Sequence, residues 1–199
     1  MNGLSKDSPP GAPSVFTSRR ERRLWFWTGV VVLAIFSTLG LANALAFALG
    51  ESGVIAVGLF LLCCFLVLLT VLAQGLDARP GGLEIAVGLG VVAAYVLVFV
   101  RMSIPTERSH LIEYGVVAIF VYEALLERAR HRPLRLPGLL AVSIASLVGV
   151  ADEGVQFLLP TRVFDPVDIL FNVLAATMAV TASASMRWAR RKVSESRSR

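Results

Sequence analysis

The stretch GLLAVSIASLVGVADEGVQFL, residues 138–158, decides the fold of this chain. It contains no charged residue before Asp152, and at a rise of about 1.5 Å per residue it is long enough to cross the roughly 30 Å hydrocarbon core of a bilayer. A segment in lipid must satisfy its backbone hydrogen bonds internally, so the stretch is predicted to be a transmembrane helix. The adjacent carboxylates of Asp152 and Glu153 are costly in such a helix and are therefore functional candidates.

The composition of the whole chain agrees with this prediction. Of the 199 residues, 56% are strongly apolar and only 17% are charged. A water-soluble domain has roughly 25% charged residues, so the composition excludes one, and it also excludes a disordered or fibrous chain. The two cysteines, Cys63 and Cys64, are adjacent, which suits neither a disulfide framework nor a metal site.

We therefore predict an all-α fold, a polytopic membrane helix bundle of about six transmembrane helices. The apolar runs that predict these helices lie at about 24–48, 54–74, 83–100, 109–126, 138–158 and 166–186. On this basis the chain divides into a disordered cytoplasmic tail at 1–20, three transmembrane helices at 21–104, three more at 105–186, and a basic cytoplasmic tail at 187–199.

The basic residues are distributed unevenly and indicate the orientation of the bundle. With the N-terminus inside, only Arg101, Arg108 and Arg162 fall in outside segments, so 16 of the 19 basic residues lie inside. The positive-inside rule then predicts that both termini are cytoplasmic. The net charge of +5 reflects this topology and the attraction of anionic lipid headgroups, and it does not indicate a nucleic-acid partner.

Polar residues gather at the predicted outer ends of the last three runs. At helical spacing His110, Glu113 and Tyr114 share one face of the fourth run, and Asp165, Asp168 and Asn172 share one face of the sixth. Helical rise places Glu113, Glu153 and Asn172 roughly 6–10 Å below the outer surface. We therefore predict a polar pocket at the depth of the outer headgroups, ringed by Arg108, His110, Glu113, Asp152, Glu153, Gln156, Arg162, Asp168 and Asn172.

Purely structural roles are the alternatives for several of these residues. Asp165 before Pro166 has the pattern of a helix N-cap with proline at the first helical position. Tyr114 is interpreted as an interfacial aromatic residue, and Asn172 could form a hydrogen bond between helices. Arg108 and Arg162 could be headgroup anchors. No comparable polar cluster is expected at the inner ends, where Gln74, Glu84 and Glu123 are scattered along the sequence.

The same residues carry a resemblance to a known family. Arg108, His110 and Tyr114, followed later by Asp152-Glu153, Gln156, Pro160, Arg162, Asp168 and Asn172, resemble the motif of the VanZ-like family of bacterial membrane proteins, which is named for a teicoplanin-resistance factor. The resemblance covers about residues 105–180. The chain departs from the family pattern at Arg108, where lysine is usual, and at Ala175 and Ala176, where a glycine commonly follows the asparagine.

The resemblance implies a multi-pass protein of the bacterial cytoplasmic (inner) membrane, and it leaves three functions open. It favours a protein that binds or occludes an envelope lipid or lipid-linked precursor, with an effect on glycopeptide susceptibility. The first alternative is a membrane-embedded hydrolase or transferase that acts on a lipid-linked phosphate or sugar headgroup. The second is a proton-coupled transporter, which is disfavoured because the acidic residues concentrate in the outer third of the spans.

For the enzyme, the candidate catalytic residues are Asp152, Glu153 and His110. One carboxylate would act as general base, His110 would shuttle the proton, and Arg108 and Arg162 would hold an anionic headgroup. Carboxylates such as Asp152, Glu153 and Asp168 suit Mg²⁺ or Ca²⁺, but the sequence shows no established ligand spacing, so we expect no cofactor and no metal. The expected partners are membrane lipids or lipid-linked envelope precursors.

Overall fold

Five α-helices make up almost all of the protein that a computed structural model describes, which is residues 15–49, 82–101, 105–158 and 165–198. No β-strand occurs within these ranges. The helices are α1 (Arg19–Leu49), α3 (Gly82–Arg101), α4 (Pro105–Ala129), α5 (Pro137–Leu158) and α6 (Pro166–Arg197). The predicted all-helical class is therefore confirmed, and the predicted span at 54–74 lies outside the described residues.

Two of the described helices are long and apolar enough to cross a membrane. They are α5, with 22 residues, and Pro166–Ser196 within α6, with 31 residues. At about 1.5 Å per residue, α5 alone is roughly 33 Å long, which matches the hydrocarbon core of a bilayer. The apolar part of α3, Gly82–Val98, is shorter.

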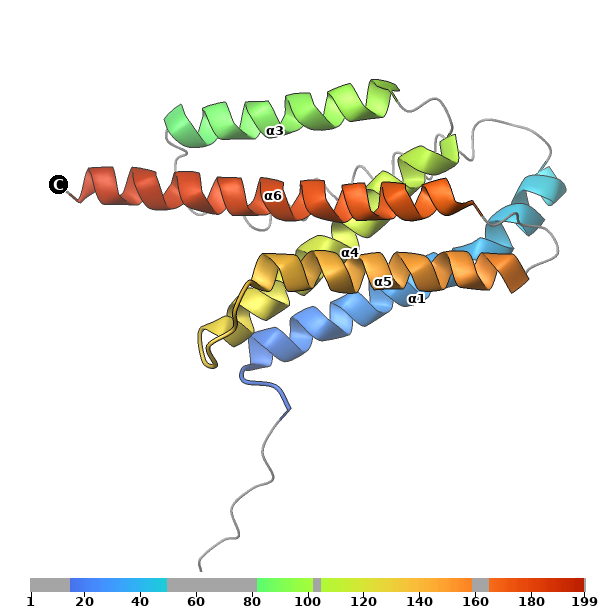
Figure 1. The fold of residues 1–199 in the computed structure, drawn as a ribbon, viewed down its shortest axis with the longest axis horizontal. Coiled ribbons are helices and arrows are strands. Elements are labelled where there is room, and N and C mark those ends of the chain that lie inside the picture. The colour runs from blue at the N-terminus through green and yellow to red at the C-terminus, as the bar shows by residue number, and fades with distance from the viewer. Residues whose placement is uncertain (1–14, 50–81, 102–104, 159–164, 199) are drawn as a thin grey trace, which may run out of the picture.

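Helix α4 lies at the centre of the bundle. It packs against α1, α5 and α6, while α3 packs on α6 (Figure 1). Val117, Ala118 and Val121 of α4 are completely buried in the main apolar core, together with alanines of α5 and α6. The chain reverses direction between α4, α5 and α6, so the beginnings of α4 and α6 lie beside the end of α5 (Figure 1).

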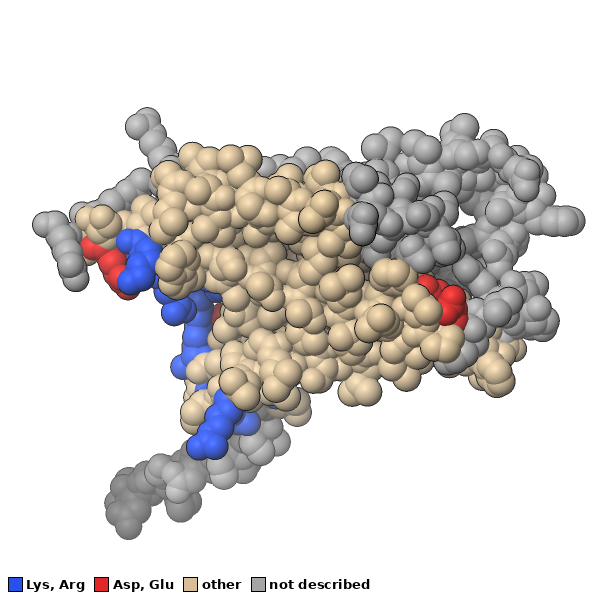
Figure 2. All heavy atoms as spheres, turned by 45° about the horizontal axis from the view of Figure 1, so that its top comes forward, with Lys and Arg blue, Asp and Glu red and all other residues tan. Residues whose placement is uncertain are grey.

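The two ends of the bundle differ in charge. We name the end where α4 and α6 begin and α5 ends the acidic end, and the end where α1 begins and α4 and α6 end the basic end. Figure 2 shows Lys and Arg side chains gathered at the basic end, with some Asp and Glu beside them, and only Asp and Glu among the charged side chains visible at the acidic end, with little charge on the face between the two ends.

The sides of the bundle expose many large apolar side chains. Leu147 of α5, Leu170 of α6 and Leu89 of α3 are each at least 66% exposed. Similar residues occur along α1, α3, α5 and α6, whereas the described side chains of α4 contribute none. A contiguous apolar surface of this kind is typical of a face that contacts lipid or another apolar partner.

Small residues allow α5 and α6 to approach closely. Ala141, Ala145 and Gly149 recur every four residues on α5 and are all buried, a spacing that brings helix backbones together in membrane proteins. The approach is closest at Gly149, where a Cβ atom would lie 2.7 Å from Nδ2 and 2.8 Å from Cβ of Asn172. Only glycine fits this position without a shift of Asn172 or of a helix.

Both ends of the described part of the chain form local structure or contacts with α4. Helix α6 continues through Arg197, so most of the predicted basic tail is helical. Helix α1 begins at Arg19, and the carbonyl oxygen of Val15 accepts a hydrogen bond from Arg128 at 2.8 Å. Residues within 15–20 thus have polar partners on α4, which local composition does not reveal.

Candidate functional site

The acidic end contains a buried polar cluster to which α4, α5 and α6 each contribute. His110 and Tyr114 come from α4, Asp152, Glu153 and Gln156 from α5, and Asp168 and Asn172 from α6. All are buried except Asp168, which is partly exposed. We call these seven residues the polar cluster. It contains six of the nine residues that the sequence predicts to surround a pocket.

His110 connects α4 to α6 on both sides of its imidazole ring. Its Nδ1 lies 2.8 Å from Oδ1 of Asn172, and its Nε2 lies 3.9 Å from Oδ2 of Asp168. An amide oxygen can only accept a hydrogen bond, so in this arrangement Nδ1 carries the proton. In the neutral ring Nε2 is then the unprotonated nitrogen, with its lone pair directed toward a carboxylate.

The carboxylates of α5 share one amide. Gln156 Nε2 donates to Oε1 of Glu153 at 3.1 Å and to Oδ2 of Asp152 at 3.3 Å. The second oxygen of Glu153 accepts a hydrogen bond of 3.4 Å from the backbone N–H of Asp165, just before α6. Glu153 therefore links the end of α5 to the start of α6 by a hydrogen bond. Gln156 offsets part of the repulsion between the carboxylates of Asp152 and Glu153.

Several polar atoms in the cluster are buried without a hydrogen bond among the described residues. They are Nδ2 of Asn172, Oδ1 of Asp152 and the hydroxyl of Tyr114; the last two form no hydrogen bond of ordinary geometry, but the side chains of Tyr114 and Asp152 lie close enough to interact with each other. Unpaired buried polar atoms cost roughly 1–3 kcal/mol each. Together these atoms provide both donors and acceptors that a bound hydroxyl group or water can bridge.

Tyr114 has a different environment from the one its sequence predicts. It is completely buried, and its ring stacks on His110 with centroids 5.8 Å apart and an interplanar angle of 15°. The interpretation of Tyr114 as an interfacial aromatic residue is therefore wrong. Its spacing of four residues from His110 was the signal in the sequence that could have placed it in the cluster.

The polar cluster does not include the other residues that the sequence predicts near the pocket. Glu113 lies on α4 beside the cluster and is partly buried. The side chain of Arg108 and the whole of Arg162 lie outside the described residues. Asp165 is confirmed as the N-cap of α6, because its side chain accepts a hydrogen bond of 2.8 Å from the N–H of Val167 and Pro166 follows at the first helical position.

One group within the cluster has the composition of a metal site. His110, Glu153 and Asp168 each offer one ligand atom, and the three atoms lie within 4.8 Å of one another. Asp152, which the sequence groups with the other two carboxylates, is not part of this triad and interacts with Gln156 instead.

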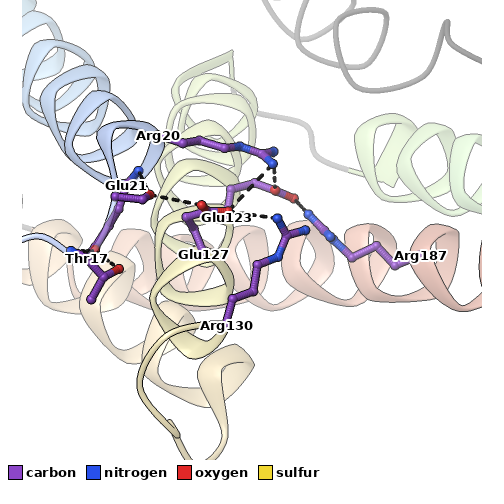
Figure 3. A network of polar contacts seen from close by, with 8 residues as sticks. Thr17, Arg20, Glu21, Glu123, Glu127, Arg130 and Arg187 are labelled. Carbon is purple, nitrogen blue, oxygen red and sulfur yellow. Dashed lines mark hydrogen bonds and ion pairs between the residues drawn. The ribbon is translucent and has the colours of Figure 1, made fainter.

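A second polar network occupies the basic end, where the sequence predicts no cluster (Figure 3). Glu123 and Glu127 of α4 are buried and pair with Arg20 of α1 at 3.7 and 3.8 Å. Arg187 of α6 also pairs with Glu123, and Arg130 pairs with Glu127 at 3.1 Å. The expectation of scattered polar residues is wrong here because the partners come from helices about 60 to 110 positions apart in the sequence.

Glu21 holds the start of α1 to this network. Its side chain is completely buried and accepts hydrogen bonds from the N–H and hydroxyl of Thr17 at 2.7 and 2.6 Å and from Nε of Arg128 at 2.7 Å. Burial alone raises the pKa of Glu21, but the hydrogen bonds from Thr17 and the charge and hydrogen bond of Arg128 together lower this pKa below its ordinary value.

Comparisons of the chain with protein-family models, curated proteins and solved structures give no match. The resemblance to the VanZ-like family therefore stands on the motif residues alone.

Proposed function

We propose that this chain is a multi-pass membrane protein of the VanZ-like kind that binds or occludes the headgroup of an envelope lipid or a lipid-linked precursor at the polar cluster. In this proposal the bundle spans the bacterial cytoplasmic membrane about six times. Both termini are cytoplasmic, and the acidic end faces outward.

The observation that carries the proposal is a buried polar cluster at one end of a bundle with apolar sides. Exposed residues such as Leu147, Phe157 and Leu170 suit contact with acyl chains, and they lie on the same two helices as Glu153 and Asn172. A lipid that approaches from the side brings its headgroup to the depth of the cluster. A soluble ligand would gain nothing from the apolar surface beneath it.

The charges at the basic end support the proposed orientation. Arginines and lysines of α1, the α4–α5 connection and the last turns of α6 lie together there (Figure 2). This is the arrangement that the positive-inside rule expects for a cytoplasmic face.

Native mass spectrometry of the gently purified protein tests this proposal. We expect a lipid adduct on the wild type that is lost in an Asp152→Asn, Glu153→Gln double variant and in an Arg108→Ala, Arg162→Ala double variant. Glu195→Gln is the matched control, because it removes an exposed carboxylate near the opposite end of α6. A wild type without lipid, or equal retention by all four proteins, contradicts the proposal.

An enzyme that acts on the same headgroup is the second candidate function. The observation that favours it is the position of Nε2 of His110 beside the carboxylates of Glu153 and Asp168, an arrangement that can transfer protons. Turnover of a lipid-phosphate substrate by the wild type that is absent in Glu153→Gln would identify a hydrolase. Turnover retained in that variant excludes Glu153 as the base.

No described feature favours a transporter. Buried carboxylates occur at both ends of the bundle, but the core between them is apolar, with Val117, Ala118 and Val121 on the central helix. A proton pathway needs polar side chains or water along that distance.

A further inference from the structure

The polar cluster combines one imidazole nitrogen with two carboxylates from two other helices. We propose that Nε2 of His110, one oxygen of Glu153 and one oxygen of Asp168 bind a divalent transition-metal cation of the Mn²⁺ or Zn²⁺ type. The site goes beyond the proposed lipid binding, since it requires no lipid to form.

The geometry of the three ligand atoms allows one ion to reach them all. They lie within 4.8 Å of one another, so an ion at their centre is at most about 2.8 Å from each, compared with bonds of roughly 2.0–2.2 Å to zinc. Each ligand atom therefore needs to move toward the ion by less than about 1 Å to form a bond of this length. Three protein ligands also leave a coordination position open for a further oxygen.

The hydrogen bond to Asn172 prepares His110 for this role. Metal-bound histidines usually donate their other ring nitrogen to an acceptor, which fixes the tautomer and the ring orientation. His110 does so through Nδ1 to Oδ1 of Asn172 at 2.8 Å, and Tyr114 stacks on the ring. The lone pair of Nε2 is thereby directed toward Asp168 before any ion binds.

The charge of the cluster is the second, independent observation. Asp152 is 1% exposed beside Glu153, its Oδ1 has no hydrogen bond of ordinary geometry among the described residues, and the charges of Asp152 and Asp168 both act on Glu153. Three carboxylates gathered in a buried place repel one another unless a positive charge or a proton compensates them. Among the side chains whose placement is described, the cluster includes neither Lys nor Arg.

The choice of ion follows from the ligand set. Carboxylates alone favour Mg²⁺ or Ca²⁺, whereas an imidazole nitrogen favours a first-row transition metal. The bound ion would also explain how a cluster rich in carboxylates attracts an anionic headgroup, because the open position can accept a phosphate oxygen. This last step rests on the proposed function, and the binding of the ion does not.

Titration of the purified, metal-stripped protein with Mn²⁺ and with Zn²⁺, in detergent without added lipid, tests the site. We expect one saturable equivalent, with affinity at least tenfold weaker in Glu153→Gln and in Asp168→Asn. The matched control is Asp165→Asn, which removes a carboxylate three residues from Asp168 and retains an N-cap side chain. A wild type that takes up no stoichiometric ion, or an Asp168→Asn variant that binds as Asp165→Asn does, overturns the inference.

A spectroscopic measurement on the wild type covers the case in which a variant fails to fold. Electron spin-echo modulation of bound Mn²⁺ should show coupling to a ¹⁴N nucleus of an imidazole. The chain has two histidines, and the other, His131, is exposed at the end of α4, so the coupling should persist in His131→Gln. Absence of nitrogen coupling in the wild type, or its loss in His131→Gln, refutes the site.

Repeating the lipid measurement with and without EDTA separates the two proposals. Ion uptake without any lipid adduct supports the cation site and contradicts headgroup binding. A lipid adduct on a protein that takes up no ion supports headgroup binding and contradicts the cation site.

Discussion

Replacing Gly149 by alanine tests the packing on which the polar cluster depends. A Cβ atom at this position would lie 2.7 Å from Nδ2, 2.8 Å from Cβ and 3.0 Å from Cγ of Asn172. The Cβ of Asn172 is fixed to the backbone of α6, so the clash cannot be relieved by moving only the end of a side chain. Either α5 and α6 separate, or Asn172 rotates and loses its hydrogen bond to His110.

The expected cost can be worked out from these two routes. Overpacking of a buried contact costs roughly 1–3 kcal/mol, and a buried ring nitrogen left without its partner costs a similar amount. Alanine is a better helix former than glycine by about 1 kcal/mol, which offsets part of this cost. We therefore expect Gly149→Ala to lower the free energy of unfolding by up to about 2 kcal/mol.

Gly154→Ala is the matched control, because Gly154 lies on the same helix and a Cβ there would meet nothing within 4 Å. Unfolding of both variants in mixed detergent and SDS micelles, followed by circular dichroism, measures the difference. Gly154→Ala should be as stable as the wild type or slightly more stable. Equal stability of the two variants would show that α5 and α6 are not in close contact at Asn172.

Two further predictions concern the ends of helices. The lowered pKa of Glu21 means that the folded protein binds a proton at this carboxyl less tightly than the unfolded chain does. The contribution of Glu21 to stability is therefore present above its ordinary pKa and is lost as the pH falls below about 4.5. A Glu21→Gln variant should have a flatter profile of stability against pH in that acidic range, and an unchanged profile would contradict this explanation. Asp165→Ala should lower the free energy of unfolding by about 0.5–2 kcal/mol because α6 loses its N-cap. Asp165→Asn should lower it by less, and chemical denaturation of both variants measures the difference.

Features that depend on neighbouring residues could be predicted from the sequence. Apolar runs of sufficient length identified the described helices, and the Asp165-Pro166 pair identified the N-cap of α6. The meeting of His110, Glu153 and Asn172 was also predictable, because each lies near the same end of its run and a bundle with short connections brings these ends together.

Features that depend on the rotation of a helix about its axis could not be predicted. Sequence spacing shows that His110 and Tyr114 share a face, but only the packing of α4 shows that this face is turned inward. The network at the basic end is a similar case, because Glu123 and Glu127 look like isolated acidic residues until α1 and α6 place arginines beside them. The contact of Gly149 with Asn172 likewise depends on the distance between two helices.

The length of α6 has a mechanical consequence. One unbroken helix of 32 residues carries Asp168 and Asn172 near one end and Arg187 in its second half. At about 1.5 Å per residue, Asp168 and Arg187 are roughly 28 Å apart along the axis. A tilt of about five degrees with Asp168 as the pivot would move Arg187 by roughly 2.5 Å relative to Glu123. The helix is therefore long enough to carry a tilt about the polar cluster to the ion pairs at the basic end.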